Sequence, residues 1–317
     1  MRHRPHRPLL SILIVFLAVG WTGCSDGASR SPKTIAQNAS VVEDGLGRKI
    51  TISKPVKRIV SLAPGATEII FAAGGLEFLV GVTTADDFPD AVKELPSFSA
   101  LPLNFESVIG LKPDLIFASS QVNNPDDAHI FEQVGIPVYF LRSNSLEQIL
   151  SGIRSVGSIL STAEVAEATA DALAIRIAVL ESVVVGLTHK PKVLTLLSST
   201  DLYSFGARSY VHDLIRLGGG ESITAQLDQD AVILNEEFII SERPDVIIGT
   251  FSAETKTSDF LINHRQWTNV PAILNNRIFA IESNLILRPG PRNVDAAEAI
   301  LSFLQPDLLL VLKSDSN

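Results

Sequence analysis

The longest uninterrupted helical pattern in the chain runs from Ala163 to Leu187. Its apolar residues alternate at spacings of four and three, which places them on one stripe of an α-helix: Ala166, Ala170, Leu173, Ile177, Leu180, Val184 and Leu187. Ser161 and Glu164 have the spacing of an N-terminal capping box, and Gly186 and Pro191 close the pattern. We predict one helix of about 25 residues and about 37 Å, long enough to cross a small protein. A coiled-coil seam or an ordinary long core helix would show the same stripe.

The sequences before and after this helix repeat one order of motifs. Each half carries Asn-x-Glu, at 104–106 and 235–237, with Pro-Asp seven residues after the glutamate and then an apolar run. Strand-like runs alternate with helix-like segments in both halves, which predicts parallel sheets with helices on both faces. Open sheets of this kind bind ligands beyond the carboxyl ends of their strands. We therefore expect two Rossmann-like α/β lobes, joined by the long helix, with a ligand cleft between them.

Turn signals set the expected boundaries. The fold class is α/β, with residues 41–144 as the N-terminal lobe, 145–188 as a helical connection and 189–317 as the C-terminal lobe. Further expected elements are a hairpin at 41–53, a strand at 58–63, helices at 64–73 and 145–160, a helix that begins at 206–209 and a C-terminal helix at about 293–304.

The N-terminus has the features of a targeting segment. Three arginines precede the apolar run from Leu9 to Gly20, which is too short for a stable membrane span. The only cysteine, Cys24, follows Trp21-Thr22-Gly23 and resembles the lipid-attachment cysteine of bacterial lipoproteins. Trp21 departs from the aliphatic residue usual there, and an ordinary secretory peptide is the alternative. We predict a signal peptide over 1–23, lipid on Cys24 and a flexible polar tether over 24–40.

Charge and motifs exclude several functions. The 317 residues carry a net charge of −9, and removal of the arginine-bearing segment makes it more negative, which argues against nucleic acid as a partner. The chain lacks Walker A, G-x-G-x-x-G, G-x-S-x-G and H-E-x-x-H motifs. Four histidines lie beyond the targeting segment without the spacing of a local metal motif: His129, His189, His212 and His264. A metal-ion receptor or an enzyme that uses them remains an alternative.

Several motifs together resemble one family, the class III substrate-binding proteins of ABC importers for cobalamin and iron siderophores. They are Arg58-Ile-Val-Ser-Leu-Ala-Pro, Thr67-Glu68-Ile69, Asp87-Phe88-Pro89, Asn104-x-Glu106, Lys112-Pro113-Asp114-Leu115, Trp267 and Arg288-Pro-Gly-Pro-Arg292. The resemblance covers about Val41 to Leu304. It implies a monomeric extracytoplasmic receptor that performs no chemistry, needs no cofactor and delivers its ligand to a permease and, through it, an ATPase.

The resemblance also implies roles for individual residues. Glu106 and Glu237 match the glutamates that dock onto the permease, although an acid so close to a helix start also stabilises the helix dipole. Arg208, at an expected helix start, and Arg288, before a Pro-Gly-Pro kink, suit ligand oxygen atoms. The full set of expected cleft residues is Pro64, Gly65, Ala66, Thr67, Phe88, Tyr203, Arg208, Asn284 and Arg288.

The ligand class is the least constrained expectation. Cobalamin receptors of this kind line the cleft with aromatic residues, and the matching positions here are Ala85, Ala100, Ser119 and Ala231. Trp267 is expected in the core. We expect a corrinoid, with a ferric siderophore as the alternative within the same class.

Overall fold

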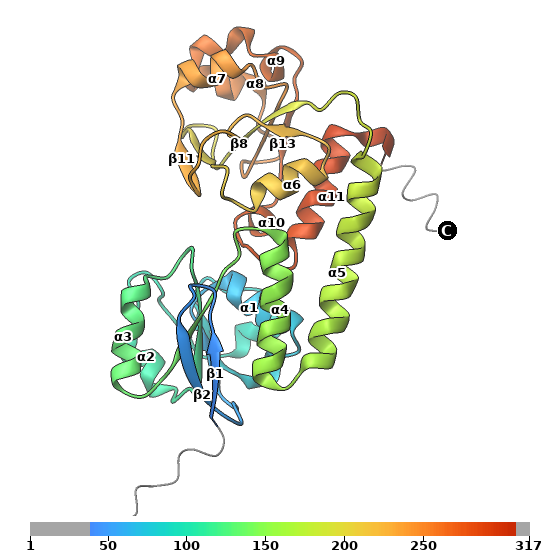
Figure 1. The fold of residues 1–317 in the computed structure, drawn as a ribbon. Helices are drawn as coiled ribbons and strands as arrows, with labels where there is room; N and C mark the ends of the chain where they lie inside the picture. The colour runs from blue at the N-terminus through green and yellow to red at the C-terminus, as the bar shows by residue number, and fades with distance from the viewer. Residues whose placement is uncertain (1–38, 309–317) are drawn as a thin grey trace, which may run out of the picture. The chain divides into compact units, whose positions relative to one another are not determined.

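The computed structural model describes residues 39–308 (Figure 1). The expected signal peptide, Cys24 and nearly all of the expected tether lie outside the described residues. Within 39–308, no helix combines the length and apolar character needed to cross a membrane. The hairpin expected near the start is confirmed, as β1 (Ala39–Glu43) pairs antiparallel with β2 (Lys49–Ser53).

The N-terminal lobe is built on a five-stranded sheet in the order β5-β4-β3-β6-β7, with every pairing parallel. Its central strands are buried on both faces, which explains their continuous apolar sequences. The strands are β3 (Ile59–Ser61), β4 (Leu79–Thr83), β5 (Ser97–Phe98), β6 (Leu115–Ser119) and β7 (Val138–Leu141). The helices are α1 (Pro64–Ala72), α2 (Phe105–Gly110) and α3 (Ala128–Gln133), with short 3-10 turns η1 (Leu76–Phe78), η2 (Asp90–Glu94) and η3 (Pro125–Asp127).

The C-terminal lobe holds a four-stranded parallel sheet in the order β10-β8-β12-β13 and a separate antiparallel pair, β9 and β11. The strands are β8 (Lys192–Leu196), β9 (Tyr203–Phe205), β10 (Glu221–Ser222), β11 (Ala231–Ile233), β12 (Val246–Gly249) and β13 (Ile278–Ala280). The helices are α6 (Val211–Leu217), α7 (Glu236–Glu242), α8 (Thr257–Asn263), η4 (Arg265–Asn269), α9 (Pro271–Leu274), α10 (Ser283–Ile286) and α11 (Asn293–Leu304). Trp267 is fully buried and stacks on His264, so its expected place in the core is confirmed.

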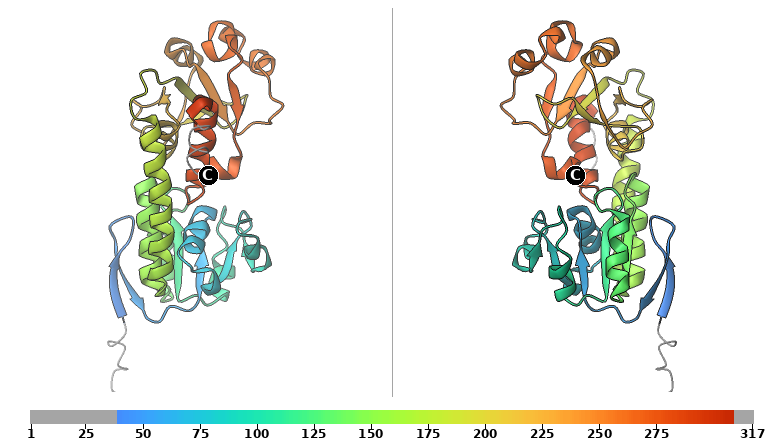
Figure 2. Two further views of the ribbon diagram at one scale, coloured as in Figure 1. Left: turned by 90° about the vertical axis from the view of Figure 1, so that its right-hand side faces the viewer. Right: turned by 90° about the vertical axis from the view of Figure 1, so that its left-hand side faces the viewer.

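The long helix is α5 (Ala163–Val184), and it follows α4 (Leu146–Leu160), with which it packs side by side (Figures 1 and 2). It contacts α1 of the N-terminal lobe as well as α6 and α11 of the C-terminal lobe. Its predicted stripe faces the core, because Ala166, Ala170, Leu173, Leu180 and Val184 are buried and the remaining two are partly buried. The helix therefore links the two lobes, as predicted.

The predicted capping box is wrong. Ser161 adopts a left-handed conformation with φ of 64° and ends α4, and Thr162 precedes α5 without capping it through its side chain. The Thr162 hydroxyl instead donates to the Ala73 carbonyl at 2.6 Å. A contact with α1 has thus replaced the local cap.

The helix expected to begin at 206–209 begins at Val211 instead. The backbone amides of Gly206, Ala207 and Arg208 donate to carbonyls of the segment 227–230, so these residues form a loop pairing rather than a helical turn. A side chain at Gly206 would lie 2.2 Å from the Gln229 carbonyl oxygen, which explains the glycine. Arg208 is therefore not at a helix start.

Candidate functional site

A cavity of about 430 Å³ is lined by residues of both lobes. The N-terminal lobe contributes the segments that follow β6 and β7, at the carboxyl ends of its parallel strands, where open α/β sheets bind ligands. The lining consists of Leu46, Ser120, Gln121, Val122, Arg142, Asn144, Phe205, Ser209, Tyr210, Asp230, Ala231, Leu287 and Pro289. We call it the inter-lobe cavity. Its lining mixes apolar side chains with uncharged hydrogen-bonding groups, one arginine and one aspartate.

A second, more polar hollow of about 550 Å³ adjoins this cavity. The two share Arg142, Asn144, Ser209 and Asp230, so they are contiguous. The other lining residues of this side pocket are Ser145, Gln148, Ala207, Arg208, His212 and Asp213.

Hydrogen bonds cross between the lobes beside the side pocket. The Asn144 amide donates to Asp230 Oδ1 at 2.9 Å and to the Arg208 carbonyl at 3.2 Å. The backbone amide of Leu146, the first residue of α4, donates to Asp213 Oδ2 at 3.0 Å. A carboxylate from the C-terminal lobe thus stabilises the positive end of a helix that follows the N-terminal sheet.

Two acid–arginine pairs form a second contact between the lobes, which we call the inter-lobe clasp: Glu68, Asp87, Asn284, Arg288 and Arg292. Arg288 forms an ion pair with Asp87 and donates to the Ala85 carbonyl at 3.0 Å. Asn284 donates to Asp87 Oδ2 at 3.1 Å. Hydrogen bonding to Arg288 lowers the pKa of Asp87 against a smaller opposing effect of burial, with the Arg288 charge and Asn284 contributing further.

The other pair of the clasp is deeper. Arg292 donates through two nitrogens to Glu68, at 2.6 and 3.0 Å, and Glu68 is only 1% exposed. Burial raises the pKa of Glu68, and the hydrogen bond and charge of Arg292 oppose that rise. The Arg292 guanidinium also lies 4.3 Å from the centre of the Phe88 ring.

The expected ligand loop at Pro64–Thr67 is largely covered. Gly65, Ala66 and Thr67 are buried, and a side chain at Gly65 would lie 2.6 Å from the Pro289 carbonyl oxygen. Pro289, which follows the clasp residue Arg288, therefore packs on the start of α1. Pro64 alone of the four is partly exposed.

The remaining expected ligand residues are spread over several places. Phe88 packs edge-on against Phe71 and lines a separate cavity of about 490 Å³ beside α5. Tyr203 is 39% exposed on β9, two residues before the cavity-lining Phe205 and therefore on the same side of the strand. Arg208 lines the side pocket, whereas Asn284 and Arg288 belong to the clasp.

The two docking candidates are both exposed at the starts of helices. Their helices are capped by other side chains, since Asn104 accepts from Ser107 N at 3.0 Å and Asn235 accepts from Phe238 N at 2.8 Å. The asparagine of each Asn-x-Glu motif therefore caps its helix. Glu106 and Glu237 make no ion pair with residues 39–308.

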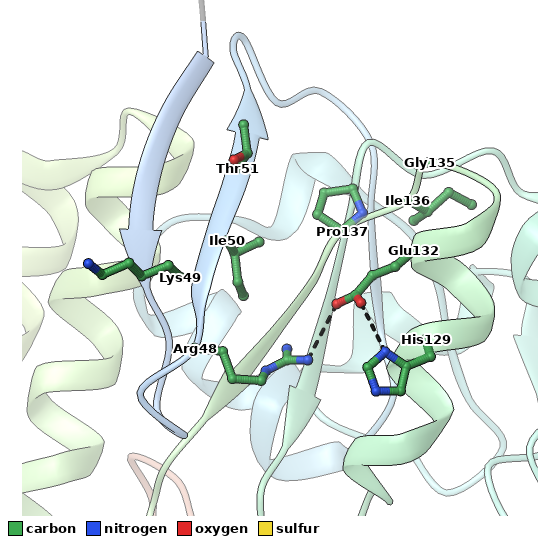
Figure 3. A pocket seen from close by; sticks show the side chains of 9 residues that line it. All are labelled: Arg48, Lys49, Ile50, Thr51, His129, Glu132, Gly135, Ile136 and Pro137. Atoms are coloured by element: carbon green, nitrogen blue, oxygen red, sulfur yellow. Dashed lines mark hydrogen bonds and ion pairs between the residues drawn. The ribbon is translucent and has the colours of Figure 1, made fainter.

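The four histidines do not meet. His264 is buried, with Nδ1 3.1 Å from Glu236 and Nε2 3.2 Å from the Ser199 carbonyl. His212 Nε2 is buried and has no hydrogen-bond partner among residues 39–308, and burial lowers the pKa of His212. His129 lies in a cavity beside the hairpin, where Glu132 stands between it and Arg48 (Figure 3). No three metal-ligating side chains gather anywhere in the described part of the chain.

Sequence reasoning missed most of the cavity lining, notably Ser120, Gln121, Arg142 and Asn144. A usable signal existed, because these residues lie within three positions after the apolar runs that form β6 and β7. The rule that ligands bind beyond strand carboxyl ends points to such positions. Asp87 belongs to the motif Asp87-Phe88-Pro89, but its partner Arg288 is 201 positions away, so no local pattern indicates this ion pair.

Comparison with known proteins gives a consistent picture. The family model for periplasmic binding proteins matches residues 59–285. An uncharacterized ABC transporter substrate-binding lipoprotein, YvrC of Bacillus subtilis, is 27% identical over 93% of this chain and 96% of its own. The vitamin B12-binding protein of Vibrio parahaemolyticus is 28% identical over 77% of this chain and 88% of its own. The solved periplasmic vitamin B12 binding protein BtuF of Vibrio cholerae superposes with a TM-score of 0.69 at 27% identity, covering 80% of this chain and 98% of its own. The solved periplasmic heme-binding protein RhuT from Roseiflexus sp. RS-1 gives the same TM-score and identity, covering 80% and 99%.

Proposed function

The chain belongs to the periplasmic binding protein family, and we propose that it captures a corrinoid outside the cytoplasm and delivers it to an ABC importer. Members of this family are transport components without enzymatic activity. The molecule held between the lobes is then the cargo, not a cofactor.

The observation that carries the corrinoid assignment is the chemistry of the inter-lobe cavity. Ser120 and Gln121 offer uncharged hydrogen-bonding groups, and the same lining holds apolar residues such as Phe205 and Leu287. A corrin ring has an apolar body and a rim of amides, which matches such a mixed lining. Similarity to vitamin B12-binding proteins of Vibrio supports the same ligand class.

Direct ligation of a haem iron is less well supported. The one tyrosine that lines the cavity, Tyr210, is 3% exposed, and its hydroxyl donates to the Ile286 carbonyl at 2.6 Å. Burial also raises the pKa of Tyr210, which disfavours the phenolate that would bind iron. A ferric siderophore is the second candidate, because Arg142 and Arg208 beside the cavity would suit its oxygen atoms.

We further propose Glu106 and Glu237 as the docking contacts for the permease. Both are exposed acids on helix starts that asparagine already caps, so the caps do not need them. Attachment of lipid to Cys24 would hold this monomeric receptor at the membrane surface. Among the expected ligand residues, Pro64, Tyr203 and Arg208 are exposed enough to meet a ligand directly, whereas Arg288 and Asn284 would act through the clasp.

The test is a ligand comparison with the chain that lacks residues 1–23. Unfolding free energy is measured with cyanocobalamin, ferrichrome, ferric citrate or haem added. A ligand present at 100 times its Kd adds about 2.7 kcal/mol. We expect this gain with cyanocobalamin. A gain seen only with an iron complex would replace the corrinoid with that ligand class.

A further inference from the structure

Arg142 is the one arginine in the lining of the inter-lobe cavity. It follows β7 directly and lines both the inter-lobe cavity and the side pocket, so it stands where the two meet. Its side chain is exposed, and its guanidinium has no hydrogen-bond or ion-pair partner among residues 39–308. The clasp arginines, by contrast, are both committed to carboxylates.

The acids near Arg142 already have partners. Asp230 accepts from the Asn144 amide at 2.9 Å and lies 3.8 Å from Arg208. Asp213 accepts from the Leu146 amide at 3.0 Å and lies 3.9 Å from Arg216. The positive charge of Arg142 is therefore left without a matching carboxylate at the junction.

The side chains around Arg142 can add neutral hydrogen bonds. Gln148 Oε1 accepts from the Asn144 backbone amide at 2.9 Å, which leaves the NH2 group of Gln148 as a donor toward the side pocket. Ser209 lines both hollows. A planar guanidinium with amide and hydroxyl groups nearby is the set that binds a phosphate or a carboxylate.

We infer that Arg142 recognises an anionic oxygen group, a phosphate or a carboxylate, on the transported ligand. The inference rests on the proposed function, because it requires that the cargo enters the inter-lobe cavity. Part of the ligand enters that cavity, and its anionic group lies at the entrance of the side pocket against Arg142.

The experiment uses two pairs of probes that differ in the anionic group. Cyanocobalamin carries a phosphodiester that dicyanocobinamide lacks, and ferric citrate carries carboxylates that ferrichrome lacks. Each probe is titrated by calorimetry into wild type, Arg142→Ala, Arg142→Lys and Arg265→Ala. Arg265 is a matched control, because it is an exposed arginine on η4 that lines neither hollow.

In the pair of probes that binds, we expect Arg142→Ala to weaken the affinity for the anion-bearing probe by roughly 10- to 150-fold, the scale of a charge-assisted hydrogen bond. The affinity for the other probe of that pair should change by less than about twofold. For the anion-bearing probe, the affinity of Arg142→Lys should lie between those of wild type and Arg142→Ala, and Arg265→Ala should match wild type. Melting curves confirm that the variants fold.

The outcomes separate the inference from the proposed function. A selective loss for cyanocobalamin supports both and identifies the phosphate. A selective loss for ferric citrate, with no corrinoid bound by wild type, supports Arg142 as the anion contact and rejects the corrinoid. Equal effects on both members of a pair, no effect on either, or a wild type that binds neither anion-bearing probe would overturn the inference.

Discussion

Breaking the Glu68–Arg292 ion pair should lower the free energy of unfolding by more than the loss of its two hydrogen bonds alone. In Arg292→Met, the Glu68 carboxylate stays in a site where its side chain is 2% exposed, and it loses both guanidinium bonds. Removal of one partner from a buried ion pair costs about 3–5 kcal/mol, because the remaining charge is uncompensated. Loss of the cation–π contact with Phe88 adds about 0.5–1 kcal/mol.

The matched control removes the charge as well. In Glu68→Met with Arg292→Met, two flexible apolar side chains replace the pair, and such replacements of buried ion pairs are often nearly neutral. We therefore expect the double variant to be more stable than Arg292→Met, with a coupling free energy of about 1–3 kcal/mol. Urea unfolding of wild type, both single variants and the double variant measures it.

The stability lost in Arg292→Met should also depend on pH, and the direction of this dependence follows from the pKa of Glu68. Burial raises the folded-state pKa of Glu68 above 4.5, so its contribution to stability is present below that value and is lost as pH rises through the folded pKa. Arg292→Met removes the two influences of Arg292 that oppose the rise. The stability gap between wild type and Arg292→Met should therefore widen from pH 5 to pH 8. Additive single variants, or a gap that narrows with pH, would refute the reasoning.

Four other expectations concern docking, lipidation, packing and motion. The double variant Glu106→Ala, Glu237→Ala should abolish uptake and leave ligand affinity and melting temperature nearly unchanged. Normal uptake would mean that both glutamates only stabilise the starts of their helices. Mass spectrometry of the mature protein should find lipid on Cys24, and an unmodified Cys24 would reject the anchor. Gly157→Val should lower the unfolding free energy by about 1–3 kcal/mol, because a Cβ at Gly157 lies 2.3 Å from that of Ala166, and unchanged urea unfolding would contradict this. Because α5 and the clasp both join the lobes, ligand should change the radius of gyration little, and scattering that shows large compaction would contradict that view.

The local elements were predictable because their signals are local. Asparagine N-caps, buried apolar strands and the core stripe of α5 each depend on a few neighbouring residues, and the structure contains them. The two errors arose where a distant contact decided the outcome. Ser161 ends α4 instead of capping α5, while the neighbouring Thr162 bonds to Ala73. Arg208 pairs its backbone with Gln229 rather than starting α6.

The site was less predictable for the same physical reason. Glu68 and Arg292 are 224 positions apart, so no local pattern shows that Arg292 neutralises a buried acid. Arg288 was expected in the ligand cleft, yet its guanidinium contacts Asp87 and Ala85, and only its neighbours Leu287 and Pro289 line the cavity. Arg142, in contrast, directly follows the apolar run of β7, so the rule that ligands bind beyond the carboxyl ends of strands points to it.

Calorimetric titration of cyanocobalamin into the chain that lacks residues 1–23 tests the central claim most directly. The account predicts saturable binding of one corrinoid per chain, as expected if the inter-lobe cavity holds the ligand. An absence of binding at a corrinoid concentration of about 1 mM, where even a weak interaction of about −4.1 kcal/mol would register, would contradict it.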